Sequence, residues 1–324
     1  MKKTKVIVTG GAGFIGSHLV KRLVMLGSLV TVVDNLSRGS LKNIKEVKDK
    51  VRFIKKDLRE ERGLEKIFEG HHLVFNLAAL NTGIDYEQGR IQEMFENNML
   101  LQMMPLRVAS RVTGISKFIQ VSSAVVYSRY AMERKVPTPE DADTCNPEPS
   151  KLGYALAKKM GENLAKWYSA KSRLKTVIVR LVNTYGETDN FDEKGHFIPV
   201  IIRKFLTAEK EVVVFGSGNQ KRSFLYVSDA VDALMLLARS GENGAVYNVD
   251  AGEEHSIKEV VDLIQKKLGN RDLRIKFDRS KPEGSKRRLL DSTKIRRLGW
   301  SPSTSLEVGL DRIIEDIARR ILQK

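Results

Sequence analysis

A run of three glycines at a strand-to-helix junction limits what this chain can fold into more than any other feature. A β-branched run at residues 5–9 leads into Gly10, Gly13 and Gly16, and an amphipathic stretch covers residues 14–26. Gly10 permits a tight turn, Gly13 lets backbone amides approach a pyrophosphate, and Gly16 lets the helix pack closely on the strand. The helix amino terminus adds partial positive charge at the same place. The pattern predicts a dinucleotide site in the first βα unit.

A turn without a ligand would use similar glycines, so the interpretation needs a second element. Asp34 provides one, because it ends the next apolar run, 24 residues after Gly10. A carboxylate at this point accepts hydrogen bonds from both hydroxyls of an adenosine ribose. The carboxylate also repels a 2′-phosphate, which favours NAD over NADP, while Arg38 nearby argues in the other direction. We expect NAD as the cofactor.

Short β-branched runs alternate with amphipathic stretches through the first half of the chain, which is typical of successive βα units. Most of the runs are almost continuously apolar, as strands buried on both faces are. The pattern predicts an α/β fold with a Rossmann-type, doubly wound parallel sheet. Strands are expected at 5–9, 29–33, 51–55, 73–77, 118–122 and 176–181, and helices at 14–26, 91–113 and 153–171.

The alternation becomes less regular after Asn183, where short strands and helices such as 257–268 follow a Gly216-Ser217-Gly218 turn. We therefore expect an NAD-binding domain over residues 1–182 and a smaller α/β substrate-binding domain over 183–324. Residues 247–249 again have the composition of a strand. Segment 227–250 is expected to rejoin the first domain.

Three residues form a candidate catalytic set. Ser123 follows the strand at 118–122, and Tyr154 and Lys158 lie four residues apart in an expected helix, so that both share one helix face. Lowering a tyrosine pKa from about 10 to about 7 requires roughly 4 kcal/mol of differential stabilisation. Lys158 and a positive nicotinamide ring would supply it. In this arrangement Tyr154 takes a proton from a hydroxyl, Ser123 hydrogen-bonds the same oxygen, and hydride passes to the cofactor.

Several motifs resemble the NAD-dependent nucleotide-sugar epimerases and dehydratases of the extended short-chain dehydrogenase/reductase type. Residues 33–39 with 43–44 are similar to UDP-glucose 4-epimerases, and the likeness covers nearly the whole chain. It implies that Asp57 and Leu58 hold the adenine and that residues 76–79 lie beneath the cofactor. With the glycine run, the expected cofactor contacts are Gly10, Gly13, Phe14, Ile15, Gly16, Asp34, Asn35, Arg38, Asp57, Leu58, Leu77, Ala78, Ala79, Asn98, Tyr154 and Lys158.

The residues after Ser123 discriminate among these relatives, since they face the sugar in this family. Sugar 4,6-dehydratases carry an acidic pair or a glutamate there, because dehydration needs an extra acid and base. Here the residues are Ala124 and Val125, which argues against dehydration. The resemblance therefore favours a nucleotide-sugar 4-epimerase, in which hydride leaves C4 and returns to the opposite face of the 4-keto sugar.

The second half of the chain favours an alternative. Segments 183–186, 189–191, 196–199, 281–284 and 289–291 resemble GDP-fucose synthases, and His196 matches their second acid/base residue. Those enzymes have a cysteine where Val125 stands. The alternative function is therefore a GDP-4-keto-6-deoxy-sugar epimerase/reductase or another ketosugar reductase. For His196 itself, a substrate contact and a hydrogen-bonded structural residue are the other two interpretations.

The same resemblance implies a binding site for a UDP- or GDP-linked sugar. Arg222 and Arg287 match arginines that bind the substrate diphosphate, for which paired guanidinium donors are suited. Asn183 matches an asparagine that contacts the same group. The expected substrate contacts are Ala124, Val125, Asn183, His196, Arg222 and Arg287. Residues 97–113 and 154–171 resemble helices that pair across a homodimer.

Composition excludes several other classes. The net charge of +16 would suit a polyanion, but the basic residues are spread along the chain and no nucleic-acid motif is present, so no nucleic-acid partner is expected. The single cysteine, Cys145, permits no internal disulfide, and no set of metal ligands is evident. Neither a signal peptide nor a membrane-spanning run is present. We expect a cytoplasmic enzyme without a metal.

Overall fold

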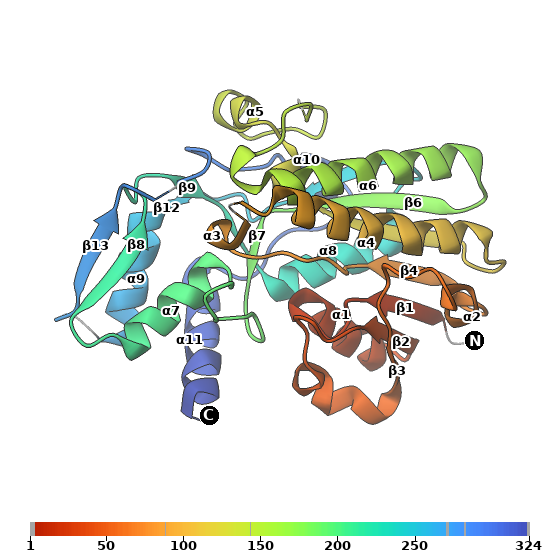
Figure 1. Ribbon diagram of the computed structural model, residues 1–324, viewed down its shortest axis with the longest axis horizontal. Helices are drawn as coiled ribbons and strands as arrows, with labels where there is room; N and C mark the ends of the chain where they lie inside the picture. Colours follow the sequence, from red (N-terminus) through yellow and green to blue (C-terminus); the bar gives the residue numbers. More distant parts are fainter. Residues whose placement is uncertain (1–3, 88, 143, 270–271, 282, 323–324) are drawn as a thin grey trace.

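The computed structural model describes residues 4–87, 89–142, 144–269, 272–281 and 283–322. It has a larger lobe built around one sheet and a smaller lobe built from parts of the later half of the chain (Figure 1). None of the helices in these ranges is long and apolar enough to cross a bilayer.

The larger lobe is centred on a seven-stranded sheet with the order β11-β6-β5-β4-β1-β2-β3, in which every neighbouring pair is parallel. This confirms the α/β class and the doubly wound parallel sheet. The chain builds outward from β1 to β3 and then crosses back to β4 on the other side of β1, so the order reverses between β1 and β4. Ligands of such sheets bind at the carboxyl ends of the strands at this reversal. The strands are β1 (Lys5–Thr9), β2 (Leu29–Asp34), β3 (Val51–Lys55), β4 (Leu73–Asn76), β5 (Lys117–Ser123), β6 (Lys175–Leu181) and β11 (Val246–Val249).

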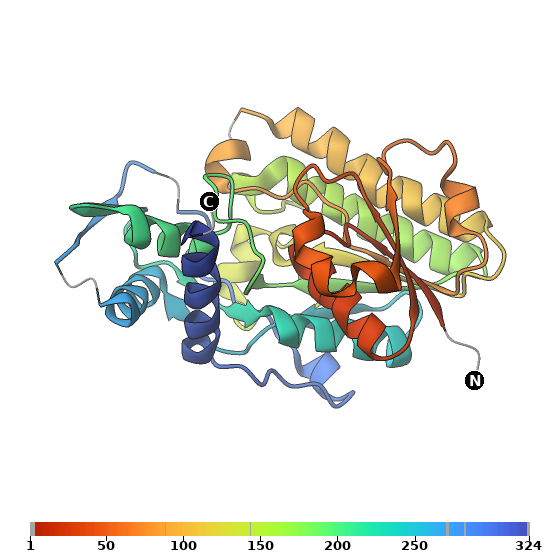
Figure 2. The same cartoon turned by 90° about the horizontal axis from the view of Figure 1, so that it is seen from below.

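Both faces of this sheet are covered by helices, which explains why its strands are continuously apolar. In β1, Val6 and Val8 belong to the core on one face, whereas Ile7 belongs to the core on the other. Figure 2 shows the helices in two layers. One layer holds α2 (Leu64–Phe68), α4 (Ile91–Arg111) and α6 (Leu152–Lys171), and the other holds α1 (Phe14–Met25), η1 (Leu41–Lys50), α8 (Val227–Ser240) and α10 (Thr293–Arg296).

The smaller lobe packs three helices against short strands around its own apolar core. Its helix α9 begins with a capping box between Ser256 and Glu259. The strand pairs are β7 (Asn183–Tyr185) with β10 (Phe224–Tyr226), β8 (Glu211–Phe215) with β13 (Arg274–Asp278), and β9 (Lys221–Arg222) with β12 (His255–Ser256); the helices are α7 (Phe197–Thr207), α9 (Ile257–Leu268) and α11 (Leu306–Leu322). Four short helices lie in connections: α3 (Ile84–Glu87), η2 (Ala124–Val126), α5 (Arg129–Arg134) and η3 (Pro149–Lys151).

Candidate active site

A cavity of about 570 Å³ lies at the carboxyl ends of the central strands and extends to residues of the smaller lobe. The structure brings most of the predicted site residues to its wall. These are Gly10, Gly13, Phe14, Ile15, Gly16, Asp34, Asn35, Arg38, Leu58, Leu77, Ala78, Ala79, Ser123, Ala124, Val125, Tyr154, Lys158, Asn183, His196 and Arg222. Asp57, Asn98 and Arg287 are not among the lining residues.

The glycine loop has the geometry that a pyrophosphate requires. Gly10 has φ of +64°, a backbone conformation that residues with a Cβ rarely adopt. A Cβ on Gly16 would lie 2.1 Å from the Gly10 carbonyl oxygen, so only glycine lets the first turn of α1 approach the loop this closely. Space for a ligand is thus left beside the amino terminus of α1. These residues fit a dinucleotide.

Asp34 supports the same loop from the end of β2. Its carboxylate accepts hydrogen bonds from the backbone N–H of Ala12 at 3.0 Å and of Leu36 at 2.8 Å. Burial raises the pKa of Asp34, and the two N–H donors counteract part of that rise. Each carboxylate oxygen has a further lone pair. Asp34 can therefore hold the loop and still accept from a ribose hydroxyl.

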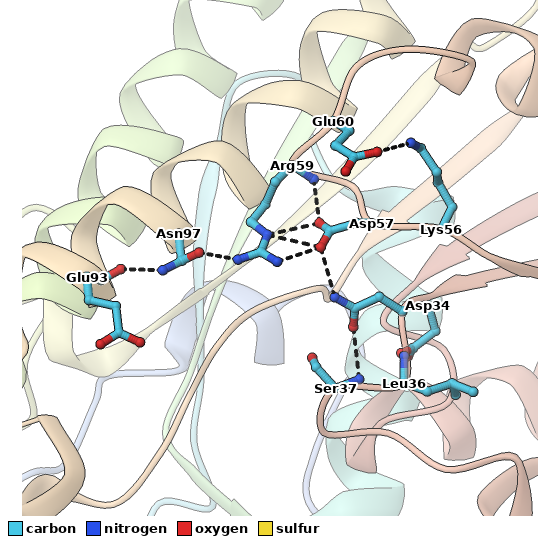
Figure 3. Close-up of polar contacts among 10 residues, drawn as sticks. Asp34, Leu36, Ser37, Lys56, Asp57, Arg59, Glu60, Glu93 and Asn97 are labelled. Carbon is cyan, nitrogen blue, oxygen red and sulfur yellow. Dashed lines mark hydrogen bonds and ion pairs between the residues drawn. The ribbon is translucent and has the colours of Figure 1, made fainter.

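The adenine end contains a polar cluster that the sequence argument described only in part (Figure 3). The Arg59 guanidinium donates to the Asp57 carboxylate from Nε at 2.9 Å and from Nη2 at 2.5 Å, and it holds the pKa of Asp57 well below its usual range. Asn35 donates to Asp57 at 3.2 Å, and Asn97 accepts from Arg59. Arg59 lines the cavity whereas Asp57 does not. Leu58 and Arg59 therefore face the cavity at the point where the adenine is expected, and Asp57 holds Arg59 in place.

Asn98 also acts from behind the cavity wall. It is fully buried, accepts from the Leu80 backbone N–H at 2.8 Å and donates to the Leu80 carbonyl at 2.9 Å. These two bonds fix the loop that follows β4, which contains Leu77, Ala78 and Ala79. Asn98 therefore holds the loop that is expected to contact the cofactor, and its own side chain does not line the cavity.

Ser123, Tyr154 and Lys158 meet at the centre of the cavity. The Lys158 ammonium donates to the Val121 carbonyl at 2.7 Å and to Gln102 Oε1 at 3.2 Å, and it lies 5.6 Å from the centroid of the Tyr154 ring. Burial lowers the pKa of Lys158 to about 7, and the Glu162 carboxylate counteracts this. The α6 helix holds both side chains because they are four residues apart.

A base at neutral pH needs a lowered pKa at Tyr154, but the side chains around Tyr154 raise this pKa instead. Burial raises this pKa, the Glu87 carboxylate adds to the rise, and the hydrogen bond with Ser123 counteracts it only in part. A phenol in so buried a position needs positive charge beside it before it can act as a base at neutral pH. Besides Lys158, the positive nicotinamide ring is the charge that bound NAD would supply beside this phenol.

The wall beyond Ser123 is apolar. Ala124 and Val125 are 2% and 4% exposed, and Val125 packs in one cluster with Tyr154 and Met94. Neither side chain can transfer a proton. The acid/base chemistry at this wall rests on the Tyr154 side.

Two arginines and Asn183 form the end of the cavity in the smaller lobe. Burial lowers the pKa of Arg222 to about 9, and the positive charge of Arg288 acts in the same direction. Arg222 donates to the Glu283 carbonyl at 2.8 Å, and Arg288 donates to Asn183 Oδ1 at 3.1 Å. The two guanidinium groups repel each other, and the Glu148 carboxylate, 3.7 Å from Arg288, offsets part of that repulsion. A diphosphate bound by both would relieve the rest.

At Arg287 the structure differs from the expectation. Its guanidinium is exposed and forms an ion pair with Glu254, while the next residue, Arg288, lines the cavity. The backbone here is extended, because Lys286 and Arg288 accept hydrogen bonds from the N–H groups of Lys221 and Ser223. Successive side chains of an extended segment point to opposite sides. Arg288, and not Arg287, is therefore placed to contact a ligand in the cavity. Pro282 of the same motif lies outside the described residues.

His196 precedes α7 at the cavity wall. Its Nδ1 lies 3.0 Å from Asp189 Oδ2 and its Nε2 lies 3.0 Å from Asn81 Nδ2. Asn81 was not singled out in the sequence, and Asp189 entered only as part of the segment 189–191, because no motif joins two loops 108 residues apart. Both line the cavity.

Arg38 links the cofactor loop to the smaller lobe. Its guanidinium donates to Asp192 Oδ2 at 3.0 Å and to the Lys194 carbonyl at 3.2 Å. Lys194 lies over the ring of Tyr86, 4.4 Å from its centroid. Segment 189–196 thus contacts Arg38 after β2 and Tyr86 of α3, two parts of the larger lobe. Within the described residues no group of three or more metal-binding side chains is present.

The sequence and fold of this chain are similar to those of known proteins. The model of the NAD dependent epimerase/dehydratase family matches residues 6–250. A putative GDP-L-fucose synthase 2 of Arabidopsis thaliana is 30% identical, with 100% of this chain and 94% of the relative aligned. A putative UDP-glucose 4-epimerase of Methanocaldococcus jannaschii is 32% identical, with 95% and 97% aligned. The crystal structure of UDP-glucose 4-epimerase with UDP-glucose from Thermotoga maritima has a TM-score of 0.88 at 29% identity and covers 98% of this chain and 100% of that one.

Proposed function

The chain belongs to the NAD-dependent epimerase/dehydratase family, and we propose that within it the chain is a nucleotide-sugar 4-epimerase. The coarser activity follows from family and fold: it is an NAD-dependent enzyme that modifies nucleotide sugars. The apolar wall of Ala124 and Val125 beside Ser123 and Tyr154 is the observation that carries the finer proposal. Redox at C4 needs only one proton-transferring group at this place, and a 4-keto sugar can turn against an apolar wall.

Each residue has a defined part in this reaction. NAD, when bound, supplies the hydride acceptor and returns the same hydride. Tyr154 removes the proton from the C4 hydroxyl, and Ser123 hydrogen-bonds that oxygen. Lys158 supplies positive charge beside the phenol, and Arg222 and Arg288 bind the diphosphate. When the sugar has turned over, Tyr154 returns the proton to the C4 oxygen.

A GDP-ketosugar epimerase/reductase is the second candidate, and His196 at the cavity wall favours it. The two functions differ in coenzyme use, because an epimerase returns its hydride whereas a reductase consumes one NAD(P)H per turnover. The test incubates purified protein with UDP-, GDP- and dTDP-sugars, with and without added NAD(P)H, and identifies the sugars by mass and sugar analysis. A 4-epimer formed without added coenzyme supports the proposal. Reaction of 4-keto sugars alone, with stoichiometric NAD(P)H oxidation, would replace it with the second candidate.

We expect the link between Arg38 and Asp192 to slow the release of NAD. Asp192→Asn should raise the NAD dissociation rate by about fivefold or less, since exposed ion pairs contribute about 1 kcal/mol at most. Trapping of released NAD in a stopped-flow experiment measures the rate. Asp232→Asn is the matched control, because Asp232 pairs with Arg22 at 3.2 Å on residues that do not line the cavity. Equal release rates for both variants would contradict the expectation.

We further propose that the active form is a homodimer that pairs α4 and α6 with their counterparts. The two helices lie against each other in one of the helical layers on the sheet, where Gly161 of α6 faces Gln102 of α4. Met160 and Trp167 are 36% and 58% exposed and, at a spacing of seven residues, share one face of α6. Light scattering during size-exclusion chromatography tests this. A mass near twice 36.6 kDa is expected, and the mass of one chain would exclude the dimer.

A further inference from the structure

Five polar side chains form a continuous chain of contacts along the cavity wall, and none is a residue of the Ser-Tyr-Lys set. The Lys151 ammonium lies 3.2 Å from Glu87 Oε1 and donates to Asn81 Oδ1 at 2.7 Å. Asn81 Nδ2 lies 3.0 Å from His196 Nε2, and His196 Nδ1 lies 3.0 Å and 3.1 Å from the oxygens of Asp189. The order is Glu87, Lys151, Asn81, His196, Asp189.

The lysine end determines how Asn81 is oriented. An ammonium group has three donors and no acceptor, so the atom that faces Lys151 must be the amide oxygen. The amide nitrogen then points toward His196 Nε2 with its two donors. Lys151 is held in this position, since it also donates to the Thr82 carbonyl at 2.5 Å and pairs with Glu87, which is 3% exposed. Asn81 cannot turn over without placing its NH₂ group against the ammonium.

The aspartate end leads to the same assignment independently. Asp189 is 2% exposed, and its Oδ1 already accepts a hydrogen bond from the Asn190 backbone N–H at 2.8 Å. A carboxylate only accepts hydrogen bonds, so the ring nitrogen that faces it must carry the proton. His196 Nδ1 is therefore the donor. Its Nε2 must be the acceptor of the Asn81 amide, because a proton on Nε2 would place two donors face to face.

We propose that Lys151, acting through Asn81, holds His196 as the neutral tautomer with the proton on Nδ1 and a lone pair on Nε2. Lys151 and Asn81 are positioning residues in this scheme, and Asp189 completes it from the other side. The assignment does not depend on which sugar is bound.

One consequence rests on the proposed function. Lys151 lies 5.4 Å from the centroid of the Tyr154 ring, so the chain of contacts reaches the reacting end of the cavity. The Nε2 lone pair of His196 accepts from Asn81, so this nitrogen carries no proton that it could deliver to a sugar. An epimerase-reductase that delivers a proton from this position would need the proton on Nε2. The tautomer thus separates the two candidate functions at one atom.

The test measures the tautomer directly on the full-length protein labelled with ¹⁵N at its five histidines. Long-range ¹H–¹⁵N correlation spectra distinguish the protonated from the unprotonated ring nitrogen, and His196→Gln assigns the signals of His196. In the wild-type protein we expect a protonated Nδ1 and an unprotonated Nε2. A protonated Nε2, in either the other tautomer or the doubly protonated ring, would overturn the proposal, and no variant other than the assignment control is needed for this outcome.

Two variants test whether Lys151 and Asn81 set the tautomer. Asn81→Asp keeps an acceptor for Lys151 but places a carboxylate oxygen against Nε2 while Asp189 still faces Nδ1. A proton is therefore expected on Nε2 as well as on Nδ1, and the Nε2 resonance should move to the protonated region. Lys151→Met, combined with Glu87→Gln so that no unpaired charge is buried, frees Asn81 to turn its amide oxygen toward Nε2. A proton on Nε2 then finds an acceptor while Nδ1 keeps its own proton, so the Nε2 shift should move toward the protonated region. Lys294→Met is the control, since Lys294 donates to the Val246 carbonyl in the larger lobe and does not line the cavity.

The outcomes divide cleanly. Changed His196 shifts in both test variants, with the control equal to wild type, support the proposal. Wild-type shifts in both test variants would show that Asp189 alone sets the tautomer, which overturns the role of Lys151. Since no substrate is present, failure of the 4-epimerase assay leaves these readings unaffected, and failure of the tautomer assignment leaves that assay unaffected.

Discussion

Tyr154→Phe is expected to lower turnover by about 10²- to 10⁴-fold, the range that a positioned acid/base group contributes. The substitution removes one oxygen, the only atom of this side chain that can take the proton from a sugar hydroxyl. The ring remains, so its packing against Val125 and Met94 is retained. Binding of NAD should change little, because the glycine loop and Asp34 are untouched. Steady-state turnover and calorimetric NAD binding measure the two effects separately.

Tyr168→Phe is the matched control for this prediction. Tyr168 lies on the same helix, α6, and loses the same atom, but it does not line the cavity. Its variant should retain turnover within about twofold. If Tyr154→Phe kept a tenth or more of the wild-type turnover, Tyr154 would not be the proton-transferring group, and His196 would become the next candidate.

The second large effect concerns the buried ion pair behind the triad. Arg180→Met is expected to lower the free energy of unfolding by about 3–5 kcal/mol, because it leaves the Glu162 carboxylate buried without its partner. Arg180 and Glu162 are 2% and 0% exposed and form two bonds, at 2.7 Å and 2.9 Å. Ser122 donates a third hydrogen bond to Glu162 at 2.6 Å. Urea unfolding at pH 7 measures the loss.

The double variant Arg180→Met with Glu162→Gln separates the cost of an unpaired charge from the loss of packing. It should recover much of the stability, since removing both charges of a buried pair is often nearly neutral. Arg319→Met is the surface control, because Arg319 and Glu315 are 60% and 78% exposed, and it should change stability by less than about 1 kcal/mol. A loss below about 1 kcal/mol in Arg180→Met would contradict the prediction.

The same pair predicts how stability depends on pH. Burial raises the pKa of Glu162, but Arg180, Ser122 and Lys159 together lower it by more, so the net shift is downward. A depressed carboxyl pKa contributes stability above the ordinary pKa of the unfolded chain, and this contribution is lost as pH falls through the lower folded value. In Arg180→Met the burial effect remains and the contribution of Arg180 is lost, so the stability of this variant should fall at a higher pH than that of wild type. Unfolding at pH 4 to 8 compares the two.

Glu162 also connects this pair to catalysis. Its carboxylate counteracts the burial that lowers the pKa of Lys158, and the two residues are one helical turn apart on α6. The buried pair therefore helps to keep the ammonium that the Tyr154 phenol needs. The same carboxylate thus stabilises the fold through Arg180 and stabilises the positive charge of Lys158 in the cavity.

The sequence by itself determined the parts of this protein that depend on local periodicity. The apolar runs predicted β1 and β3 at their observed bounds and the other strands of the large sheet to within one residue at each end. Strands covered by helices on both faces must be apolar throughout, so their composition shows them directly. The glycine run and the four-residue spacing of Tyr154 and Lys158 were equally readable, because a close backbone approach and a shared helix face are each set within one element.

Tertiary structure alone decided which polar side chains meet. Arg288 rather than Arg287 lines the cavity, because the pairing of residues 286–288 with β9 selects which side chain points inward. Arg59 rather than Asp57 lines the cavity, since the Asp57 carboxylate binds the guanidinium two residues away. Asn81 and His196 come from two loops and Lys151 from the short helix η3, and their hydrogen bonds exist only once the lobes are packed. Such contacts depend on distances between elements, which no local pattern encodes.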